Sequence, residues 1–355
     1  MIAFLLSTVI ALFLAPVIIK IYSRQDWIDD PRKSKHVKKT HQEPVPRGGG
    51  IVIFIAILIA ALLLLQIDKY LIAILLGALI LTIVGTLDDI LNLHPVIRLV
   101  AGLIAALLVV GSGIGIAYVS HPFTEGVIHL NQAQISLFLF NKVRTIWILA
   151  DIFALIFIVW NMNIINWSKG VDGQLPGFVS MAAIFIGILS YRFVDDPTQF
   201  NTANLSFIVA GAFFGFLFWN WYPQKIMPGY GAGSLAGYFL SILSILSGAK
   251  VATTLMVLAI PTADGIFTIL RRILAGKSPL WGDRGHLHHK LMDVLGWGRR
   301  RIAVFYWMSS LLMGILSLYL QTKAKIFAIL LALTFVFSFH IWVKIKSKNK
   351  QYLIN

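Results

Sequence analysis

Hydrophobic residues occur along the chain in long runs that are separated by short polar segments. Several runs reach about twenty residues, the length that a helix needs to cross a hydrocarbon core roughly 30 Å thick. Eleven such runs lie near 1–22, 48–67, 70–87, 97–119, 145–166, 175–191, 204–222, 231–248, 250–270, 302–320 and 325–344. The pattern predicts an all-α polytopic membrane protein with eleven transmembrane helices.

Composition agrees with a membrane protein. Hydrophobic residues make up 58% of the 355 residues and charged residues 13%, more apolar side chains than one soluble core holds. The first run has no basic residue before it and no small-residue cleavage site after it, so we interpret it as a span and not as a signal peptide. The chain has no cysteine, which excludes disulfides and thiolate chemistry. Without repeats or long linkers, residues 1–355 are predicted to form one membrane domain.

Basic residues are distributed unequally between the polar segments. If the chain starts outside and alternates, 23 of its 30 Lys and Arg residues fall on the inner side. The positive-inside rule then predicts an external N-terminus and a cytoplasmic C-terminus. The net charge of +15 is confined to loops beside the membrane, which favours lipid head groups and phosphorylated substrates over nucleic acid.

The polar segments on the two sides differ in their chemistry. Two external segments, about 120–144 and 192–203, show no clear periodicity and are expected to be ordinary loops. On the inner side, a basic stretch with Lys39 leads into Arg47-Gly48-Gly49-Gly50, where the second run begins. Glycines at a helix N-terminus allow an anion to approach backbone amides. The alternative is that these glycines end a loop and the lysines are solvated near lipid.

Two further inner segments carry carboxylates and amides at the ends of apolar runs. Asp88 and Asp89 are adjacent, and two acids at a hydrocarbon boundary need a positive partner such as Mg²⁺, unless they only make a helix end soluble. Asn163 and Asn166 share a helix face and precede Lys169-Gly170-Val171-Asp172-Gly173. The amides either bind a ligand or join neighbouring helices.

The last inner segment contains three histidines within four residues. His286, His288 and His289 follow the basic residues Arg272 and Arg284. Such a cluster can bind zinc, but the absence of cysteine and the nearby cations favour an anion, and imidazole and guanidinium donors suit a pyrophosphate.

These motifs, in this order, resemble those of the polyprenyl-phosphate N-acetylhexosamine-1-phosphate transferases, the WecA/TagO/MraY family, over about residues 29–295. The matching elements are Lys39-Thr40-His41 to Gly50, Asp88-Asp89 with Arg98, Asn163 and Asn166 before Gly170-Val171-Asp172-Gly173, and His286-Leu287-His288-His289.

The resemblance implies a reaction as well as a fold. An N-acetylhexosamine 1-phosphate passes from a UDP-sugar, UDP-GlcNAc as the first candidate, to undecaprenyl phosphate, and UMP is released. The implied cofactor is Mg²⁺, with Mn²⁺ as an alternative. The implied location is a bacterial plasma membrane with the active site on the cytoplasmic face, where this transfer is the first membrane step of cell-envelope polysaccharide synthesis.

Two departures from the family motifs remove negative charge. Lys169 replaces the first acid of an Asp-Gly-x-Asp-Gly turn, and a Gly-Asp-x-Gly-Ser turn aligns with 228–234, where Gly231 stands in place of the acid. One hypothesis is that Asp264 moves into the vacated metal position. A second is that Lys169 replaces metal charge by binding the pyrophosphate directly.

The resemblance assigns roles to individual residues. Asp88 and Asp89 would hold the metal or take the proton of the lipid phosphate, and Asp172 would orient metal or nucleotide, with Asp264 as a further metal ligand. The residues expected to bind substrates are Asn163 and Asn166 for the nucleotide, Arg272, Arg284, His286, His288 and His289 for pyrophosphate and sugar, and Lys39, Arg47 and Lys169 for phosphates.

Two other classes of function were compared with the transferase. A catalytically inactive relative that binds polyprenyl phosphate or a nucleotide sugar would explain the missing acids, but the Asp88-Asp89 pair and the histidine motif are retained. An ion-coupled transporter would place ionisable residues at mid-membrane, whereas here they gather at one face. The sequence leaves open the oligomeric state, a homodimer included.

Overall fold

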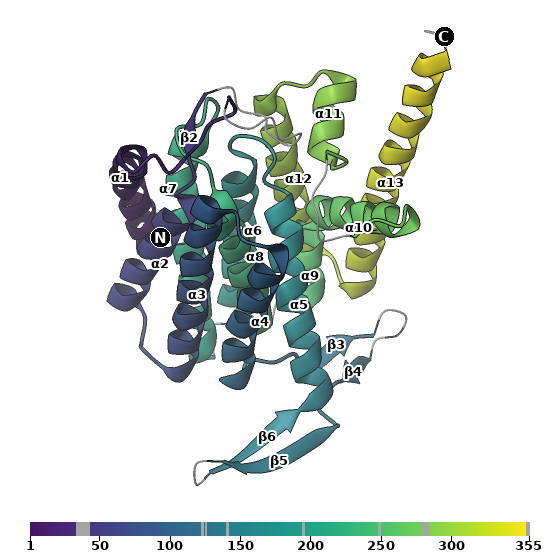
Figure 1. Ribbon diagram of the computed structural model, residues 1–355. Coiled ribbons are helices and arrows are strands. Elements are labelled where there is room, and N and C mark those ends of the chain that lie inside the picture. The colour runs from purple at the N-terminus through teal and green to yellow at the C-terminus, as the bar shows by residue number, and fades with distance from the viewer. Residues whose placement is uncertain are drawn as a thin grey trace.

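The computed structural model describes residues 1–32, 43–121, 124, 126–139, 142–193, 196–247, 250–278 and 284–352. Each of the eleven predicted apolar runs contains a helix. These helices are α1 (Ile2–Arg24), α2 (Gly49–Leu64), α3 (Lys69–Leu91), α4 (Pro95–Gly111), α5 (Ile148–Trp167), α6 (Gln174–Ser190), α7 (Pro197–Asn220), α8 (Gly229–Leu246), the pair α9 (Lys250–Val257) and α10 (Ala259–Leu274), α12 (Arg299–Tyr319) and α13 (Thr322–Tyr352). Figure 1 shows them as one bundle.

Most of these helices have the length and hydropathy of membrane spans. Within the described ranges, seven helices are long and apolar enough to cross a bilayer, and the bent pair α9–α10 makes an eighth if it is one span. Three apolar helices, α2, α4 and α6, are shorter than eighteen residues. The fold is therefore that of a polytopic helical membrane protein, and the count of eleven spans and the sides of the termini stay predictions.

The ninth apolar run is broken into two helices that meet at an angle of 84°. α10 begins at Ala259, and Pro261 lies in its first turn, where its missing backbone N–H costs no hydrogen bond within α10. In Figure 1 α10 lies across the other helices and reaches α13, against which it packs. The bend places Asp264 next to the segment that carries the histidines.

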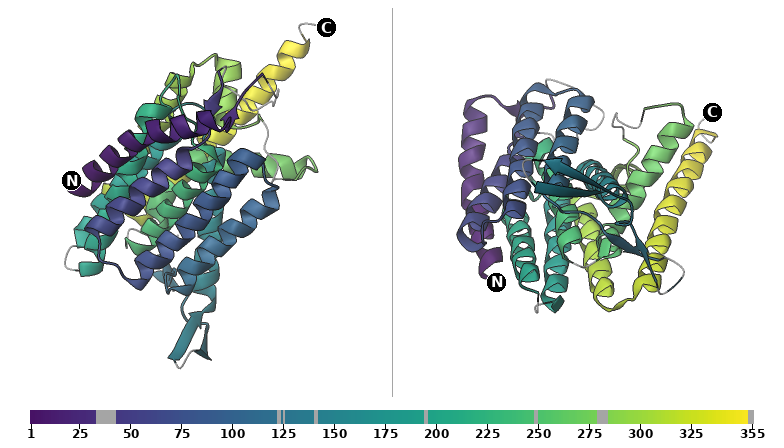
Figure 2. Two further views of the ribbon diagram at one scale, coloured as in Figure 1. Left: turned by 60° about the vertical axis from the view of Figure 1, so that its left-hand side comes forward. Right: turned by 90° about the horizontal axis from the view of Figure 1, so that it is seen from below.

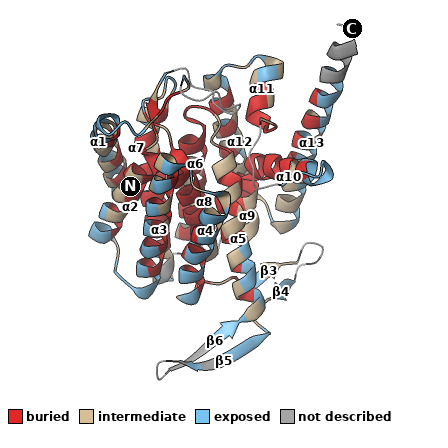
Figure 3. Cartoon of the chain, viewed as in Figure 1, coloured by how far each residue is buried: buried red, intermediate tan, exposed pale blue. Residues whose placement is uncertain are grey.

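α8 is the central helix of the bundle. In its apolar window 83% of the residues are buried, against 28% in α1 and 22% in α13. It packs against α2, α3 and α5 through small residues. A Cβ added to Gly231 would lie 3.2 Å from the Cα of Gly50, so the two backbones are in close contact. Figure 3 shows the buried centre and the exposed outer surfaces of the peripheral helices.

Two short hairpins occupy a segment that the sequence predicted to be a loop. They pair β3 (Tyr118–Ser120) with β4 (Val127–His129), and β5 (Gln134–Leu139) with β6 (Lys142–Trp147), both antiparallel. The prediction of loops was wrong here and also at 197–203, where α7 begins with Pro197. Polar and apolar residues alternate only over the first residues of β5 and β6, which is too short a pattern to predict strands. The second hairpin projects from the bundle in both Figure 1 and Figure 2.

The opposite end of the bundle carries the polar connections. There β1 (Ile28–Asp29) pairs with β2 (Val45–Pro46), and α11 (Leu287–Leu295) covers the end of α12 (Figure 1). The Met227 N–H donates to the Pro46 carbonyl at 2.7 Å, and the Gly49 N–H donates to the Met227 carbonyl at 3.1 Å. These bonds hold the segment before α8 against the start of α2.

Candidate active site

Two acids at the C-terminal end of α3 meet the beginning of α8. Asp89 Oδ1 accepts a hydrogen bond from the Tyr230 N–H at 2.9 Å. Gly229 has a φ of +65°, and a Cβ there would overlap the Asp89 carboxylate, so only glycine lets this backbone reach the acid. The neighbouring Asp88 is buried. The start of α8 is thus built around the Asp88-Asp89 pair.

Two cations of the chain face these acids. Arg98, in the first turn of α4, places Nη1 3.3 Å from Asp88 Oδ2. Lys169, in the turn after α5, donates from Nζ to the Gly229 carbonyl. The Arg98 guanidinium lies 5.2 Å and the Lys169 ammonium 5.9 Å from the centroid of the Tyr230 ring, within range of cation–π attraction. We call Asp88, Asp89, Arg98, Lys169 and Tyr230 the acid cluster.

The charge of Lys169 depends on its surroundings. Burial lowers the pKa of the Lys169 ammonium to about 8, although the carboxylates of Asp89 and Asp88 favour the charged form. At neutral pH the ammonium therefore remains largely protonated. One of its N–H donors binds the neutral Gly229 carbonyl, which leaves two donors for an anionic ligand.

The turn that contains Lys169 brings further polar atoms to the same region. Asn166 Oδ1 lies so close to Gly233 of α8 that a Cβ on that glycine would overlap it. Asp172 Oδ2 accepts from the Gln224 N–H at 3.2 Å and lies 3.6 Å from Arg299 Nη1. Among the described residues no hydrogen-bond partner reaches the buried atoms Asn166 Oδ1, Asp172 Oδ1 and Asp88 Oδ1. Buried polar atoms without a protein partner indicate a ligand or bound water.

A second group of titratable side chains surrounds Asp264 of α10. Asp264 Oδ1 accepts from the Leu287 N–H at 2.7 Å and lies 3.1 Å from His340 Nε2 of α13. Asp264 Oδ2 lies 2.9 Å from His286 Nδ1. One carboxylate thereby joins α10, the start of α11 and α13. We call Asp264, His286, His288, His289 and His340 the histidine cluster.

His288 and His289 are buried neutral imidazoles. Burial lowers the pKa of His288 well below its usual value and that of His289 to about 4, and neighbouring cations and histidines act in the same direction. Their Nδ1 atoms are buried and, within the described part of the chain, lack a hydrogen-bond partner. The His288 ring lies so close to Gly170 that a Cβ on that glycine would overlap the ring. Through this contact the histidine cluster adjoins the turn that carries Lys169.

The sequence of this chain is similar to those of known proteins. The model of glycosyl transferase family 4 matches residues 71–248, which lie inside the predicted region of resemblance. The chain belongs to this family. The match begins in α3 and ends after α8, so it includes the acid cluster and the turn after α5.

Three relatives illustrate the similarity to individual members of glycosyl transferase family 4. A probable undecaprenyl-phosphate N-acetylglucosaminyl 1-phosphate transferase of Bacillus subtilis is 27% identical, covering 92% of this chain and 91% of the relative. A phospho-N-acetylmuramoyl-pentapeptide-transferase of Bacillus velezensis is 28% identical, covering 90% and 95%. A decaprenyl-phosphate N-acetylglucosaminephosphotransferase of Mycolicibacterium smegmatis is 26% identical, covering 78% and 72%.

Several residues predicted to bind substrates form their hydrogen bonds or ion pairs with groups outside these two clusters. Asn163 donates to the Val159 carbonyl of its own helix at 2.8 Å, and Arg272 donates to the Ser278 carbonyl at 2.7 Å. Arg284 forms a two-pronged ion pair with Asp293 on the surface of α11. Arg47 binds Asp29, although its backbone carbonyl lies near Gly229. Lys39 lies outside the described residues.

The structure also adds residues that were not predicted to belong to the site. Tyr230 and Arg98 complete the acid cluster, Arg299 faces Asp172, and His340 binds Asp264. The sequence offered a way to find His340, because a single ionisable residue inside an apolar run indicates a buried polar partner. Arg98 belongs to the motif that resembles the family, but its pairing with Asp88 depends on how α4 packs back beside α3.

Within the part of the chain that the structure describes, the acids do not form a metal-binding group. The resemblance implies a divalent metal, yet in the described ranges no three His, Asp or Glu side chains lie close enough together to hold one. Asp88 faces Arg98, Asp89 faces Lys169, Asp172 faces Arg299, and Asp264 is bound by two histidines and an amide. The donor set therefore does not fit the divalent ion that the resemblance implies.

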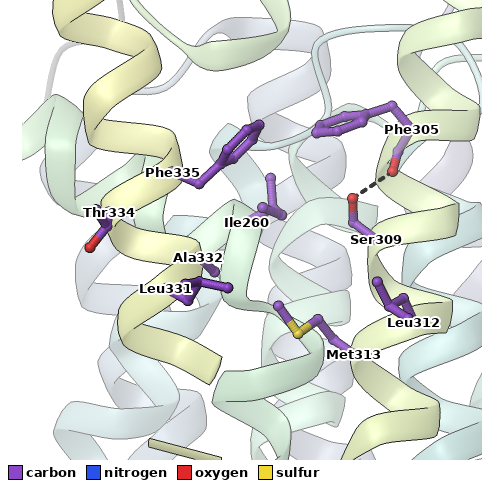
Figure 4. A pocket seen from close by; sticks show the side chains of 9 residues that line it. All are labelled: Ile260, Phe305, Ser309, Leu312, Met313, Leu331, Ala332, Thr334 and Phe335. Atoms are coloured by element: carbon purple, nitrogen blue, oxygen red, sulfur yellow. Dashed lines mark hydrogen bonds between the residues drawn. The ribbon is translucent and has the colours of Figure 1, made fainter. Parts of the chain in front are cut away.

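A cavity of about 510 Å³ lies between α10, α12 and α13. Figure 4 shows its lining, which includes Ile260, Phe305, Met313 and Phe335. Its hydroxyls bind carbonyls of their own helices, Ser309 to Phe305 at 2.8 Å for example. None of its lining residues belongs to the acid cluster or the histidine cluster. Such an apolar volume suits a hydrocarbon group and takes no part in the polar chemistry.

Proposed function

We propose that this chain transfers N-acetylhexosamine 1-phosphate from a UDP-sugar to a polyprenyl phosphate and releases UMP. The observation that carries the proposal is the contact of Gly170 with His288, which joins the acid cluster to the histidine cluster at one end of the bundle. Carboxylates, an ammonium, a guanidinium and neutral imidazoles from separate helix ends then line one region. Family membership and the names of the relatives support this reaction class.

The proposed step is a displacement at phosphorus. An oxygen of the lipid phosphate forms a bond to the sugar-bearing phosphorus, and the bond from that phosphorus to the bridging oxygen breaks as UMP leaves. Negative charge grows on the bridging oxygen, so positioning and nearby positive charge supply most of the catalysis. Lys169 and Arg98 are the cations of the acid cluster that can meet this charge. Asp89 is the candidate acceptor for a lipid phosphate proton.

The remaining polar atoms suit the nucleotide and the sugar. Asn166 and Asp172 each present a buried oxygen to which the described residues offer no partner, so hydroxyl or amide donors of the nucleotide sugar can bind there. His288 and His289, held neutral, can each donate one hydrogen bond and accept another. We propose His286 as the residue that Asp264 orients, and we assign Asp264 a positioning role in place of metal binding.

The location of the active site is part of the same proposal. The predicted inner segments hold 23 of the 30 basic residues and include the residues of the acid cluster, so we propose that this end of the bundle faces the cytoplasm. The donor proposed first is UDP-GlcNAc, because two of the three relatives described above carry acetylglucosamine in their names. We propose a role in bacterial cell-envelope polysaccharide synthesis, as the resemblance implies.

The test uses the purified chain in detergent with undecaprenyl phosphate and a panel of UDP-sugars. UMP release together with a lipid-linked sugar product is expected for at least one donor, with UDP-GlcNAc tried first. Asp89→Asn should remove the product. Binding of a UDP-sugar without any UMP or lipid product, with and without divalent ions, would support an inactive binding protein and refute the transferase.

A further inference from the structure

The carboxylates of the acid cluster already have cationic partners supplied by the chain. Arg98 lies beside Asp88 at 3.3 Å, and Asp89 accepts from the Tyr230 N–H while Lys169 binds the adjacent Gly229 carbonyl. The two acids and two cations therefore sum to no net charge. A divalent ion entering here would find both carboxylates already balanced by the ammonium and the guanidinium, whereas a diphosphate can accept hydrogen bonds from the N–H donors of these two cations.

The position at which the family motif has an acid offers no replacement ligand. Gly231 is packed between two other glycines. A Cβ on Gly231 would lie 3.2 Å from the Gly50 Cα and 3.7 Å from the Gly85 Cα. A carboxylate could not be accommodated without moving α2 or α3 away from α8. Asp264 does not supply the missing acid either, because both of its oxygens are occupied within the histidine cluster.

We propose that Lys169, together with Arg98, supplies the positive charge that holds the diphosphate, and that the acid cluster works without a divalent metal. The part concerning the diphosphate rests on the proposed function. Lys169 is suited to this task because its backbone is fixed in the turn after α5 and its ammonium is anchored on the Gly229 carbonyl. A lysine ammonium is a compact charge with three donors, and one donor is used by that carbonyl.

The first experiment measures metal binding and requires no turnover. Purified protein in detergent is titrated with Mn²⁺, and free Mn²⁺ is followed by electron paramagnetic resonance. The wild-type chain is expected to show no saturable site with a Kd below about 1 mM. A saturable site that is lost in Asp89→Asn would overturn the proposal.

The second experiment measures the affinity for UDP in the presence of EDTA and then with Mg²⁺. The Kd of the wild type should change by less than about twofold, and Lys169→Met should weaken it by about tenfold or more in EDTA. Lys169→Arg, which keeps the charge, should retain most of the affinity and shows that a loss in Lys169→Met is not a folding defect. Equal affinities of wild type and Lys169→Met would overturn the proposal.

The matched control is Lys225→Met. Lys225 precedes α8, is exposed, and lies 5.6 Å from the Trp219 ring, so the variant removes one charge from the polar segment before α8 without touching the acid cluster. Its affinity for UDP should equal that of the wild type. An equal loss in Lys225→Met and Lys169→Met would mean that only overall charge matters, which contradicts a specific role of Lys169.

Transfer assays separate this inference from the proposed function. Transfer in EDTA at a rate within about twofold of that in Mg²⁺ supports both. Transfer that requires Mg²⁺ supports the proposed function and overturns the inference. If no donor is used under either condition, the proposed function fails, and the Mn²⁺ and UDP titrations still decide whether Lys169 replaces the metal.

Discussion

The acid cluster and the histidine cluster hold their carboxylates in different ways. In the histidine cluster both oxygens of Asp264 are occupied, by the Leu287 amide and His340 on one side and by His286 on the other. In the acid cluster Asp88 keeps one buried oxygen to which the described residues offer no partner. A saturated carboxylate fixes its neighbours, whereas one with an open oxygen remains able to bind a ligand. The difference supports the proposal that Asp264 positions its neighbours and that Asp88 takes part in the chemistry.

The two clusters also differ in the charge of their nitrogen-containing side chains. The histidines around Asp264 include two imidazoles that burial keeps neutral, while the acid cluster contains a lysine and an arginine. Neutral donors recognise hydroxyl and amide groups, and fixed cations stabilise charge that develops in a phosphoryl transfer. We therefore expect substitutions in the acid cluster to affect turnover more strongly than substitutions in the histidine cluster.

The largest effect is expected for Asp89→Asn, which removes one charge from the acid cluster while keeping the side-chain size. Transfer should fall by about 100- to 1000-fold, because the proton acceptor and the charge balance of the site are lost together. Initial rates of UMP release measure this effect. The control is Asp68→Asn at the other end of α3, where asparagine replaces aspartate as an equally good N-cap and should leave the rate unchanged.

A smaller loss of turnover, combined with a loss of stability, is expected for Asp264→Ala. The Leu287 amide and two histidines would lose their buried acceptor, which should cost about 3 kcal/mol of stability and roughly 10- to 100-fold in rate. Thermal unfolding in detergent and UMP release measure the two effects. Asp264→Asn with full activity and unchanged stability would contradict the positioning role.

His340→Phe should reduce the rate by about tenfold with little change in the affinity for UDP, because His340 acts only through Asp264. The ring should still stack on Phe267, whose centroid lies 4.2 Å from that of His340. His340→Gln retains a hydrogen-bond donor and should recover part of the rate. A purely structural role would instead lower the unfolding temperature of both variants without changing the rate of the folded protein.

The smallest effect concerns pH and the neutral histidines. The pKa of His289 lies at about 4 in the folded chain and near 6.5 when unfolded, so the unfolded chain binds a proton first as the pH falls. The stabilisation is complete above about pH 6.5 and is lost between pH 6.5 and pH 4, on the order of 3 kcal/mol. Thermal unfolding at pH 8, 6 and 5 checks this slope. His289→Gln should make the slope shallower, and an unchanged slope would assign it to other groups.

Local patterns were sufficient to predict much of the fold. All eleven apolar runs contain helices, because the length and hydropathy of a span are properties of a continuous segment. The break before α10 was not predicted, since both of its halves are apolar and Pro261 fits the first turn of a helix as well as a kink. The hairpins at 118–147 were missed because long apolar runs on both sides dominate the signal.

The sequence by itself determined that this protein is solvated by a bilayer and which polar residues stand at the ends of its helices. Only the tertiary structure decided which partner each charge has. Lys169 binds Gly229 across 60 residues and Asp264 meets His340 across 76, so neither pairing leaves a local pattern. Hydropathy depends on each residue and its neighbours, whereas a buried ion pair depends on which helix ends the folded bundle brings together.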